Sequence, residues 1–583
     1  MLKKIWYNKK INSTLYVEII FAHTMKRYIK ILLLASLALA ACGKDEITIV
    51  DDPSADPTDD TDTLPVASGT VAVVFSPTGD ATVSGTGSDL SATVDGNGVT
   101  IVYTGSEMIE YDLSGTTSNG YLKIYSTKKQ TISLNNVSIA NPAGAAINVQ
   151  GTQANPNKGK AVYLVVNGSN SLADGSTYSN TPSSEDEKGV IFAEGQIIVS
   201  GSGSLSVTAN GKSGIASDDY VRFTDNAVLT VTSTAGHGVR ANDYVQVSSG
   251  TLNISVSADM KKGISSDSLV LFDGGNTTIH ITGGTAYDSD DGDYTGSAGI
   301  KADSVFRMEN GTLTITNSGT GGKGINCDGS GTFSGGTLSI TCTGSNYGSS
   351  GGGGHWGGGS NSNSVSAKGI KCDGDINISG GSITVSASSH EGIESKGKIS
   401  ISGGHVYSYS KDDAINAAGN MTISGGYVCA HSTGNDGMDA NGNLYIEGGV
   451  VYAIGASSPE MAVDANTEGG YKLYVNGGTL IAIGGLERGA SLAQTCYSTN
   501  SWNRSTWYAL TVGNEVYAFK TPASGGSPLV VSGNSQPTLA SGVSVSGGTS
   551  YFNGTLTVGG SVSGGSNVSL STYTGGGGGG WWH

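Results

Sequence analysis

A unit of 22 to 25 residues recurs along the middle of the chain, and this repeat constrains the fold more than any other feature. Each unit holds an aliphatic residue after Gly or Ala, a small residue, Asp or Asn, and then two short alternating strands separated by Gly-Gly. Insertions at residues 285–298 and 343–366 lengthen two of the units. Self-similarity of this kind predicts that equivalent residues stack in columns. The aliphatic column comprises Val190, Ile215, Val239, Ile264, Ile300, Ile325, Ile370, Ile393, Ile415, Met438 and Val463.

A unit of this size cannot bury a core alone, but stacked units bury a continuous aliphatic column between parallel strands about 4.8 Å apart. We therefore predict an all-β fold: a single-stranded parallel β-helix, that is, a solenoid of 22 to 25 residues per coil with N- and C-terminal β caps. A β-propeller needs roughly 40 residues per blade, and a β-sandwich would not keep one residue type in one column. The composition agrees with strands and turns, since 92 of 583 residues are Gly and 14% are charged.

The N-terminal residues resemble an export signal followed by a lipid-attachment site. Residues 31–41 are apolar, follow the basic Lys26-Arg27, and are shorter than the roughly 20 residues that a membrane-spanning helix needs. The sequence Leu-Ala-Ala-Cys at 39–42 resembles a bacterial lipobox, so we predict lipidation of Cys42 and initiation at Met25. The acidic tag after Cys42 favours a surface-exposed outer-membrane lipoprotein, with a soluble secreted protein as the alternative.

Composition divides the chain into five segments. Residues 1–41 are predicted to be the signal peptide and 42–65, rich in Asp, Thr and Pro, a disordered stalk. Residues 66–188 are predicted to form the N-terminal cap and first coils, 189–500 the main repeat region, and 501–583 a C-terminal β appendage with a Gly-rich tail. The net charge of −17 argues against a nucleic-acid partner, and we expect a monomer.

Acidic residues occupy the later coils at positions where earlier coils carry lysine. Equivalent side chains of adjacent coils lie about 5 Å apart, so carboxylates stacked there repel one another unless a cation intervenes. Stacked oxygen ligands suit Ca²⁺, which takes six to eight of them. A solvated acidic face with screened charges is the alternative. The predicted calcium ligands are Glu391, Glu394, Asp412, Asp413, Asn416, Asp436, Asp439 and Asp464.

The insertion at 285–298 is a weaker calcium candidate. It contains Asp288, Asp290, Asp291 and Asp293, but Gly292 stands where an EF-hand would place its fifth-position ligand. We therefore interpret it as a polar loop.

Aromatic residues also gather in the later coils, at strand positions that alternation predicts to face outward. Flat rings can stack on the C–H faces of sugars while neighbouring carboxylates and amides supply polar contacts. Stacking between coils that only stabilises the sheet is the alternative. The predicted carbohydrate-binding residues are His405, Tyr407, Tyr409, Tyr427, His431 and Tyr452.

Four short sequences carry a resemblance to a known family: DDAIN at 412–416, NDGMD at 435–439, GIKAD at 299–303 and SGSGSLSV at 200–207. They resemble the carbohydrate-binding-domain family of bacterial calcium-binding parallel β-helices, which is related to polysaccharide lyase family 9. The likeness covers roughly residues 134–485 and marks 189–500 as the carbohydrate-binding domain. It implies calcium in the coils and binding, without cleavage, of plant cell-wall polysaccharides such as cellulose and polygalacturonate.

Catalysis is not expected from this chain. The related lyases use a Lys as general base a coil or two beyond the Asp cluster, whereas residues 412–471 contain neither Lys nor Arg. The sequence also lacks a Ser-His-Asp pattern and a phosphate loop. We predict a non-catalytic, calcium-dependent polysaccharide-binding surface lipoprotein. A structural or adhesive surface solenoid and a pectate-lyase-like enzyme are the alternatives.

Overall fold

The computed structural model describes residues 64–85, 87–179, 181–290, 292–348 and 363–575. The chain divides into two units, Met1–Leu64 and Pro65–His583, and the description below concerns the second. The predicted signal peptide, Cys42 and Asp291 lie outside the described residues. Within the described ranges there is no helix that is long and apolar enough to cross a membrane.

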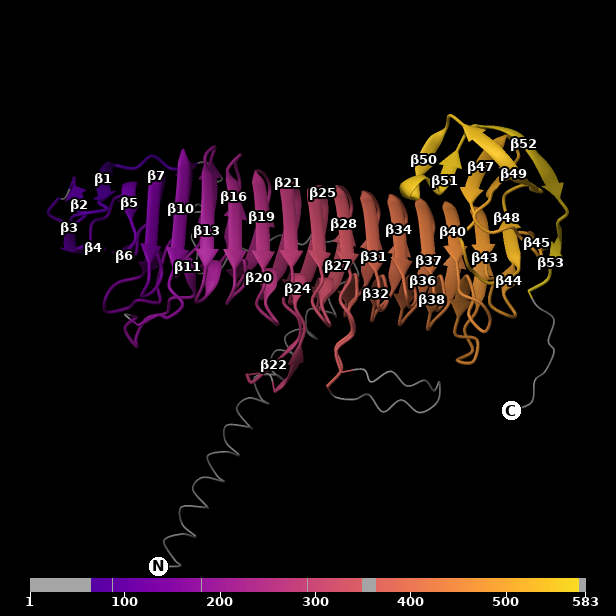
Figure 1. Ribbon diagram of the computed structural model, residues 1–583, viewed down its shortest axis with the longest axis horizontal. Coiled ribbons are helices and arrows are strands. Elements are labelled where there is room, and N and C mark those ends of the chain that lie inside the picture. Colours follow the sequence, from indigo (N-terminus) through magenta and orange to yellow (C-terminus); the bar gives the residue numbers. More distant parts are fainter. Residues whose placement is uncertain (1–63, 86, 180, 291, 349–362, 576–583) are drawn as a thin grey trace, which may run out of the picture. The chain divides into compact units, whose positions relative to one another are not determined.

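One parallel sheet of 15 strands runs along the stack, with successive coils contributing one strand each (Figure 1). Only its first pair, β3 and β4, is antiparallel. The strands are β3 (Leu90–Asp95), β4 (Asn97–Tyr103), β6 (Gly120–Tyr125), β8 (Ile147–Gln150), β11 (Gly189–Ala193), β14 (Ser213–Ser217), β17 (Val239–Ala241), β20 (Lys262–Ser266), β24 (Ala298–Ala302), β26 (Lys323–Cys327), β29 (Ile370–Cys372), β32 (Ile393–Ser395), β35 (Ile415–Ala417), β38 (Met438–Ala440) and β41 (Val463–Ala465).

The aliphatic column predicted from the repeat is confirmed in this sheet. Ile300, Ile325, Ile370, Ile393 and Ile415 are register partners on consecutive strands, and all five are buried in the main core. The spacing of the repeat therefore sets the register.

A sheet of 30 strands forms the rest of the stack as two rows. The first row holds β9 (Val162–Asn167), β12 (Ile197–Gly201), β15 (Val221–Phe223), β18 (Tyr244–Val247), β27 (Ser330–Phe333), β30 (Ile376–Ile378), β33 (Ile399–Ile401), β36 (Met421–Ile423), β39 (Leu444–Ile446), β42 (Leu473–Val475) and β44 (Ser491–Leu492). The second holds β10 (Ser169–Asp174), β13 (Ser204–Ala209), β16 (Val228–Ser233), β19 (Thr251–Val256), β28 (Thr337–Cys342), β31 (Ser382–Ala387), β34 (His405–Ser410), β37 (Tyr427–Ser432), β40 (Val450–Ile454) and β43 (Thr479–Ile483).

Four long strands belong to both rows: β5 (Ile109–Thr117), β7 (Gln130–Asn141), β21 (Leu269–Ile281) and β25 (Val305–Asn317). The first part of β7 pairs with β9 and its second part with β10, and β21 pairs in the same way with β18 and β19. The ends of the sheet are formed by β1 (Gly69–Phe75), β2 (Thr82–Ser84), β45 (Cys496–Thr499), β48 (Leu529–Ser532) and β53 (Ser571–Tyr573).

These long strands correct the predicted fold class. Parallel pairing runs from β7 through β9, β12, β15 and β18 to β21, and back through β19, β16, β13 and β10, which closes a ring of ten strands. The prediction of a single-stranded parallel β-helix was therefore wrong, because the fold is this closed parallel ring with flanking strands and sheets. The two rows are joined there because Asn136 and Gly275, with φ of 57° and 68°, turn the chain inside β7 and β21.

Glycine pairs turn the chain before the strands of the second row. Gly381, Gly404, Gly426, Gly449 and Gly478 all have φ between 75° and 81°. A Cβ atom at any of them would lie within 2.8 Å of backbone atoms of the preceding coil. Only glycine meets both conditions, which explains the recurrence of Gly-Gly in the sequence.

Residues after the stack form an antiparallel sheet of six strands, here called the C-terminal sheet. It consists of β46 (Trp507–Val512), β47 (Glu515–Lys520), β49 (Thr538–Ser546), β50 (Thr549–Tyr551), β51 (Leu556–Val558) and β52 (Ser561–Val568), with a short 3-10 turn at Phe552–Gly554. It packs on the second row over β37, β40 and β43 and shares a separate apolar core with them (Figure 1).

Candidate functional site

The outer face of the 15-stranded sheet carries a column of side chains whose charge reverses along the stack. Register pairs connect Arg240, Ser265, Lys301, Asn326, Lys371, Glu394, Asn416, Asp439 and Asp464 in that order. The lysines of the first half are paired with acids beside them. Lys301 lies 2.9 Å from Asp303 and 2.5 Å from Asp328, and Lys371 lies 2.6 Å from Asp373.

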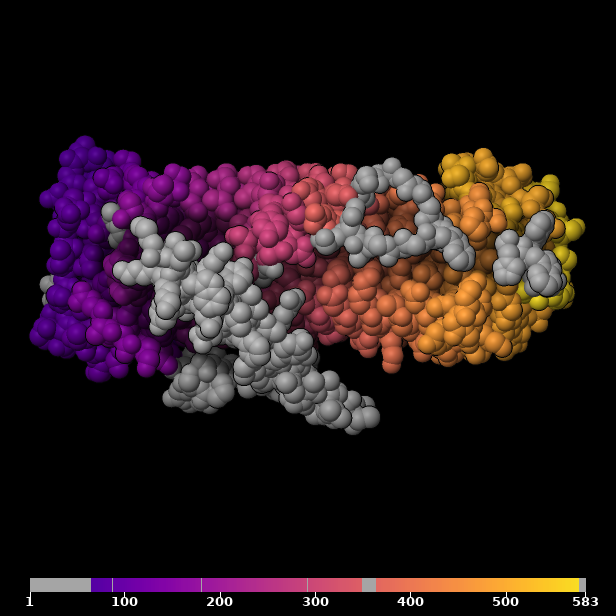
Figure 2. Space-filling view, turned by 90° about the horizontal axis from the view of Figure 1, so that it is seen from below, coloured from indigo at the N-terminus to yellow at the C-terminus, as the bar shows by residue number. Residues whose placement is uncertain are grey.

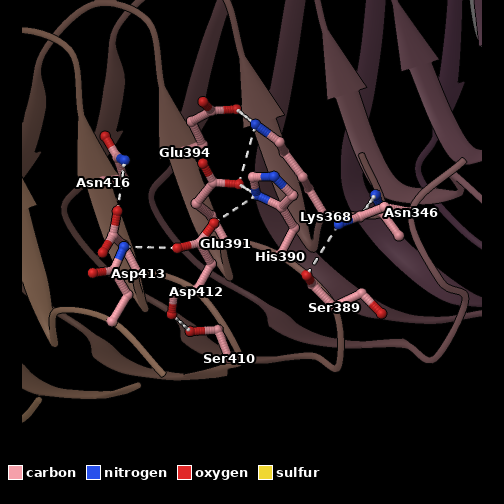
Figure 3. A network of polar contacts seen from close by, with 12 residues as sticks. Asn346, Lys368, Ser389, His390, Glu391, Glu394, Ser410, Asp412, Asp413 and Asn416 are labelled. Atoms are coloured by element: carbon pink, nitrogen blue, oxygen red, sulfur yellow. Dashed lines mark hydrogen bonds and ion pairs between the residues drawn. The ribbon is translucent and has the colours of Figure 1, made fainter. Parts of the chain in front are cut away.

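A buried ion-pair network marks the coil where the charge changes sign (Figure 3). Lys368 lies 3.1 Å from Glu391 and also pairs with Glu394, which contacts Lys396 as well. Burial lowers the pKa of Lys368, but the two glutamates outweigh it and raise this pKa above its usual range. Lys368 is therefore a charged structural partner at neutral pH and not a free base.

His390 connects this network to the next coil. Its Nδ1 contacts Glu391 and lies 3.1 Å from Asp412 Oδ2. Burial raises the pKa of Glu391, but the hydrogen bond with His390 and the charge of Lys368 bring it to about 2. Ligand atoms of His390, Glu391 and Asp412 lie within 4.8 Å of one another, so these three residues could hold a metal ion.

The following coils carry enclosed carboxylates without cationic partners. Among the described residues, no ion pair involves Asp413, Asp436, Asp439 or Asp464. Burial, reinforced by neighbouring acids, raises the pKa of Asp413 to about 8 and that of Asp439 to about 6. It likewise raises the pKa of Asp436 to about 7. We call these four residues the acidic ladder.

Backbone and amide groups orient the acidic ladder. The Asn416 amide donates to Asp413 Oδ2 at 2.9 Å, and the backbone N–H of Asp436 donates to Asp413 Oδ1 at 3.1 Å. The backbone N–H of Met461 donates to Asp436 Oδ1 at 2.5 Å. Each coil thus fixes a carboxylate of the coil before it.

Glu487 extends the acidic ladder, although it was not among the calcium ligands predicted from the sequence. A parallel bridge between Val463 and Leu486 places Glu487 beside Asp464. Burial and a hydrogen bond with Glu487 raise the pKa of Asp464 to about 9. A signal was present, because Glu487 follows Asp464 by 23 residues, one period of the repeat.

The predicted calcium ligands therefore fall into two groups. Glu391 and Asp412 meet at His390, while Glu394 is held by two lysines. Asn416 and the acidic ladder continue along the next coils. His390 was also missed, although it directly precedes Glu391.

The predicted sugar-binding rings lie mostly under the C-terminal sheet. Tyr427 stacks on Tyr551 with ring centroids 4.2 Å apart, and Tyr407 stacks on Phe552 at 6.0 Å. The ring of Tyr551 also lies 5.0 Å from that of His405, which stays exposed.

Tyr452 was predicted to bind carbohydrate, but only 1% of its surface is exposed, so it cannot contact a ligand here. It packs against Phe519 and donates a hydrogen bond to the Lys520 carbonyl at 2.9 Å. The alternation that turns this ring away from the main core was predicted correctly, but a second layer covers it. Tyr409 and His431, with ring centroids 5.0 Å apart, are half-buried.

Comparison with known proteins places this architecture in a family. A family model described as carbohydrate-binding domain-containing protein matches residues 95–262, 254–348, 347–414 and 386–437, which together span more than half of the chain. The chain belongs to this carbohydrate-binding-domain family. Its matched region includes the His390 cluster and the start of the acidic ladder, and ends before the C-terminal sheet.

Among solved structures, the polysaccharide lyase-like protein from C. thermocellum, as its gadolinium derivative, is 22% identical to this chain. The match covers 47% of this chain and 97% of that chain, with a TM-score of 0.36, which is too low to support a structural argument. No curated protein matches the chain.

Proposed function

We propose that this protein binds polysaccharide through calcium held at the acidic ladder and does not cleave it. The observation that carries the proposal is that Asp413 and Asp436 are buried, and Asp439 and Asp464 half-buried, on consecutive coils without a cationic partner among the described residues. Burying like charges side by side is costly unless they are neutralised. A divalent cation neutralises them and uses their oxygens.

The donor set fits calcium. Carboxylate oxygens and the Asn416 amide are the hard ligands that Ca²⁺ prefers. The backbone hydrogen bond to Asp436 holds Oδ1, so Oδ2 remains to bind a cation. Both oxygens of Asp413 accept one hydrogen bond each, and each keeps a second lone pair for a cation. His390 offers a nitrogen, which suits Ca²⁺ less well, so we assign the calcium to the acidic ladder.

Bound calcium would supply positive charge to a face that otherwise repels acidic sugars. The chain's own residues orient that charge and leave the outer face of the 15-stranded sheet accessible to a polymer. We propose polygalacturonate-type polysaccharide as the ligand, because its regularly spaced carboxylates can complete the coordination of calcium ions. The family supports the carbohydrate part of this proposal.

The pairing of the lysines at the sign change supports binding over cleavage. A lysine that abstracts a proton beside a uronate must be a neutral amine at the operating pH. Lys368 and Lys371 are both paired with acids in this region. Incubation with polygalacturonate and calcium should therefore release no unsaturated uronide absorbance; sustained release would contradict the non-catalytic proposal.

Affinity electrophoresis in gels containing polygalacturonate tests the binding proposal. We expect retardation of the full chain in calcium and its loss in chelator. Asp439→Asn with Asp464→Asn should abolish the calcium-dependent part, whereas Asp80→Asn, the same change at an exposed carboxylate between β1 and β2, should not. Retardation that is the same in calcium and in chelator, or that remains calcium-dependent after the double substitution, would refute the role of the acidic ladder.

We also propose that Cys42 carries lipid that attaches the protein to the outer membrane, with the described unit at the cell surface. Labelling of cells with a fatty-acid analogue should mark the protein and fail to mark Cys42→Ser. Accessibility to protease added to intact cells separates the outer from the inner leaflet.

A further inference from the structure

The two insertions of the repeat, predicted separately in the sequence, meet in the structure. The first forms a hairpin of β22 (Ala286–Asp288) and β23 (Asp293–Thr295), which projects from the stack (Figure 1). Figure 2 views the molecule from the side on which this hairpin lies. The second insertion is closed at its base by an antiparallel bridge between Tyr347 and Val365.

Three tyrosines join the two insertions. Tyr287 and Tyr294 face each other across the hairpin with ring centroids 5.3 Å apart and planes at 68°. The ring of Tyr294 in turn lies 5.2 Å from that of Tyr347, with planes at 33°. We call these residues the tyrosine cluster.

The tyrosine cluster is partly exposed: Tyr287 is exposed, whereas Tyr294 and Tyr347 are half-buried. Tyr287 is 56% exposed. Among the large hydrophobic side chains of the described residues, only Val66 is more exposed. The Thr285 hydroxyl donates to the Thr320 carbonyl at 2.8 Å, and the backbone N–H of Gly292 donates to the Asp288 carbonyl at 2.8 Å. These hydrogen bonds fix the base and the turn of the hairpin. The rings of Tyr287 and Tyr294 therefore keep defined positions at which a ligand can contact them.

The surroundings of the tyrosine cluster do not fit an apolar protein partner. Tyr287 and Tyr294 share one face of the hairpin, alternation places Asp288 and Asp293 on its other face, and the hairpin has few aliphatic side chains. A protein-binding patch instead has an apolar centre in which acidic residues are depleted. Sugars match better, because the exposed ring face of Tyr287 can receive their C–H groups without an aliphatic surround.

Charge restricts the kind of sugar. Asp288, Asp290 and Asp293, together with the net charge of −17, repel uronates at this hairpin. We propose that the tyrosine cluster binds neutral polysaccharide by stacking, without calcium. This site goes beyond the acidic ladder: it rests on glycan binding as the function of the protein, but it uses other residues and another ligand class.

Affinity electrophoresis of the full chain in chelator, with hydroxyethylcellulose or glucomannan in the gel, tests this proposal. We expect the wild type to be retarded, and Tyr287→Ala and Tyr294→Ala to bind at least about fivefold more weakly, as loss of an aromatic contact predicts. Tyr287→Phe keeps the ring and should bind like the wild type. Tyr471→Ala removes another exposed tyrosine, 42% exposed, and is the matched control.

Three results would overturn the proposal. They are absence of retardation of the wild type by every neutral glycan in chelator, unchanged retardation of Tyr287→Ala, and Tyr287-dependent binding of polygalacturonate in chelator. Thermal unfolding of the Tyr287 variants should match the wild type, because Tyr287 is mostly exposed. Polygalacturonate gels with calcium report on the acidic ladder separately, so failure of one site does not obscure the other.

Discussion

Neutralising Asp413 should have opposite effects on stability with and without calcium. Asp413 is 5% exposed, and burial together with Asp439, Asp412 and Asp436 raises its pKa from 3.8 to about 8. A shift of that size corresponds to an upper bound of ~6 kcal/mol against the charged form. Since local relaxation and water reduce such penalties severalfold, we expect Asp413→Asn to stabilise the calcium-free protein by ~1–2 kcal/mol at pH 8.

The pH dependence follows from the direction of the shift. Because the folded-state pKa of Asp413 is raised, the folded protein holds this proton when the unfolded chain has lost it, between about pH 4 and pH 8. The free energy of unfolding therefore falls as pH rises through this window. Below about pH 4 both states are protonated, and Asp413→Asn should leave stability unchanged.

Thermal unfolding followed by circular dichroism, in chelator and in excess calcium at pH 4, 6 and 8, measures both effects. In chelator at pH 8 the variant should melt a few degrees above the wild type. In calcium the order should reverse, because the wild type gains more from binding a cation. A lower melting temperature for the variant in chelator at pH 8, or an equal gain from calcium in both proteins, would refute the reasoning. Asp80→Asn is the control.

Two further substitutions test the contacts around the site. Lys368→Ala leaves Glu391 and Glu394 buried without their shared cation, so it should lower the free energy of unfolding in urea by ~3 kcal/mol; a loss below ~1 kcal/mol would mean that the network is hydrated. Tyr452→Phe removes the hydrogen bond to the Lys520 carbonyl and should cost ~1 kcal/mol, seen as faster proteolytic release of the C-terminal sheet. An unchanged rate of release would show that this bond does not hold the sheet in place.

The repeat allowed the interior of the fold to be predicted, but not its closure. Ile370, Ile393 and Ile415 could be aligned from sequence because every coil must bury an aliphatic residue in the same place. At Asn136 and Gly275 the chain turns the corner inside one strand. Gly275 shares its positive φ with glycines such as Gly381 that stand between separate strands, and the pairing of β21 with β25 shifts register around it, so the Gly-Gly period does not distinguish the two cases.

The candidate site, too, could be predicted from the repeat only in part. Acids at repeat positions could be placed on one face, since register follows from spacing. The covering of Tyr427 and Tyr452 depends on Tyr551 and Phe519, which lie in a segment without the repeat. A two-residue alternation shows which way a ring points, but not what packs on it.

The reversal of charge along the outer column gives this face an electric polarity parallel to the stack. Arg240, Lys301 and Lys371 lie toward one end, and Glu394, Asp439 and Asp464 toward the other. Because acids pair with Lys301 and Lys371, a polyanion approaching this face would meet little net charge in the first half and could extend over the acidic half only after cations had reversed its sign. If the protein binds an acidic polysaccharide as proposed, ionic strength and divalent ions would then decide how many sugar units it binds and in which direction along the stack binding extends.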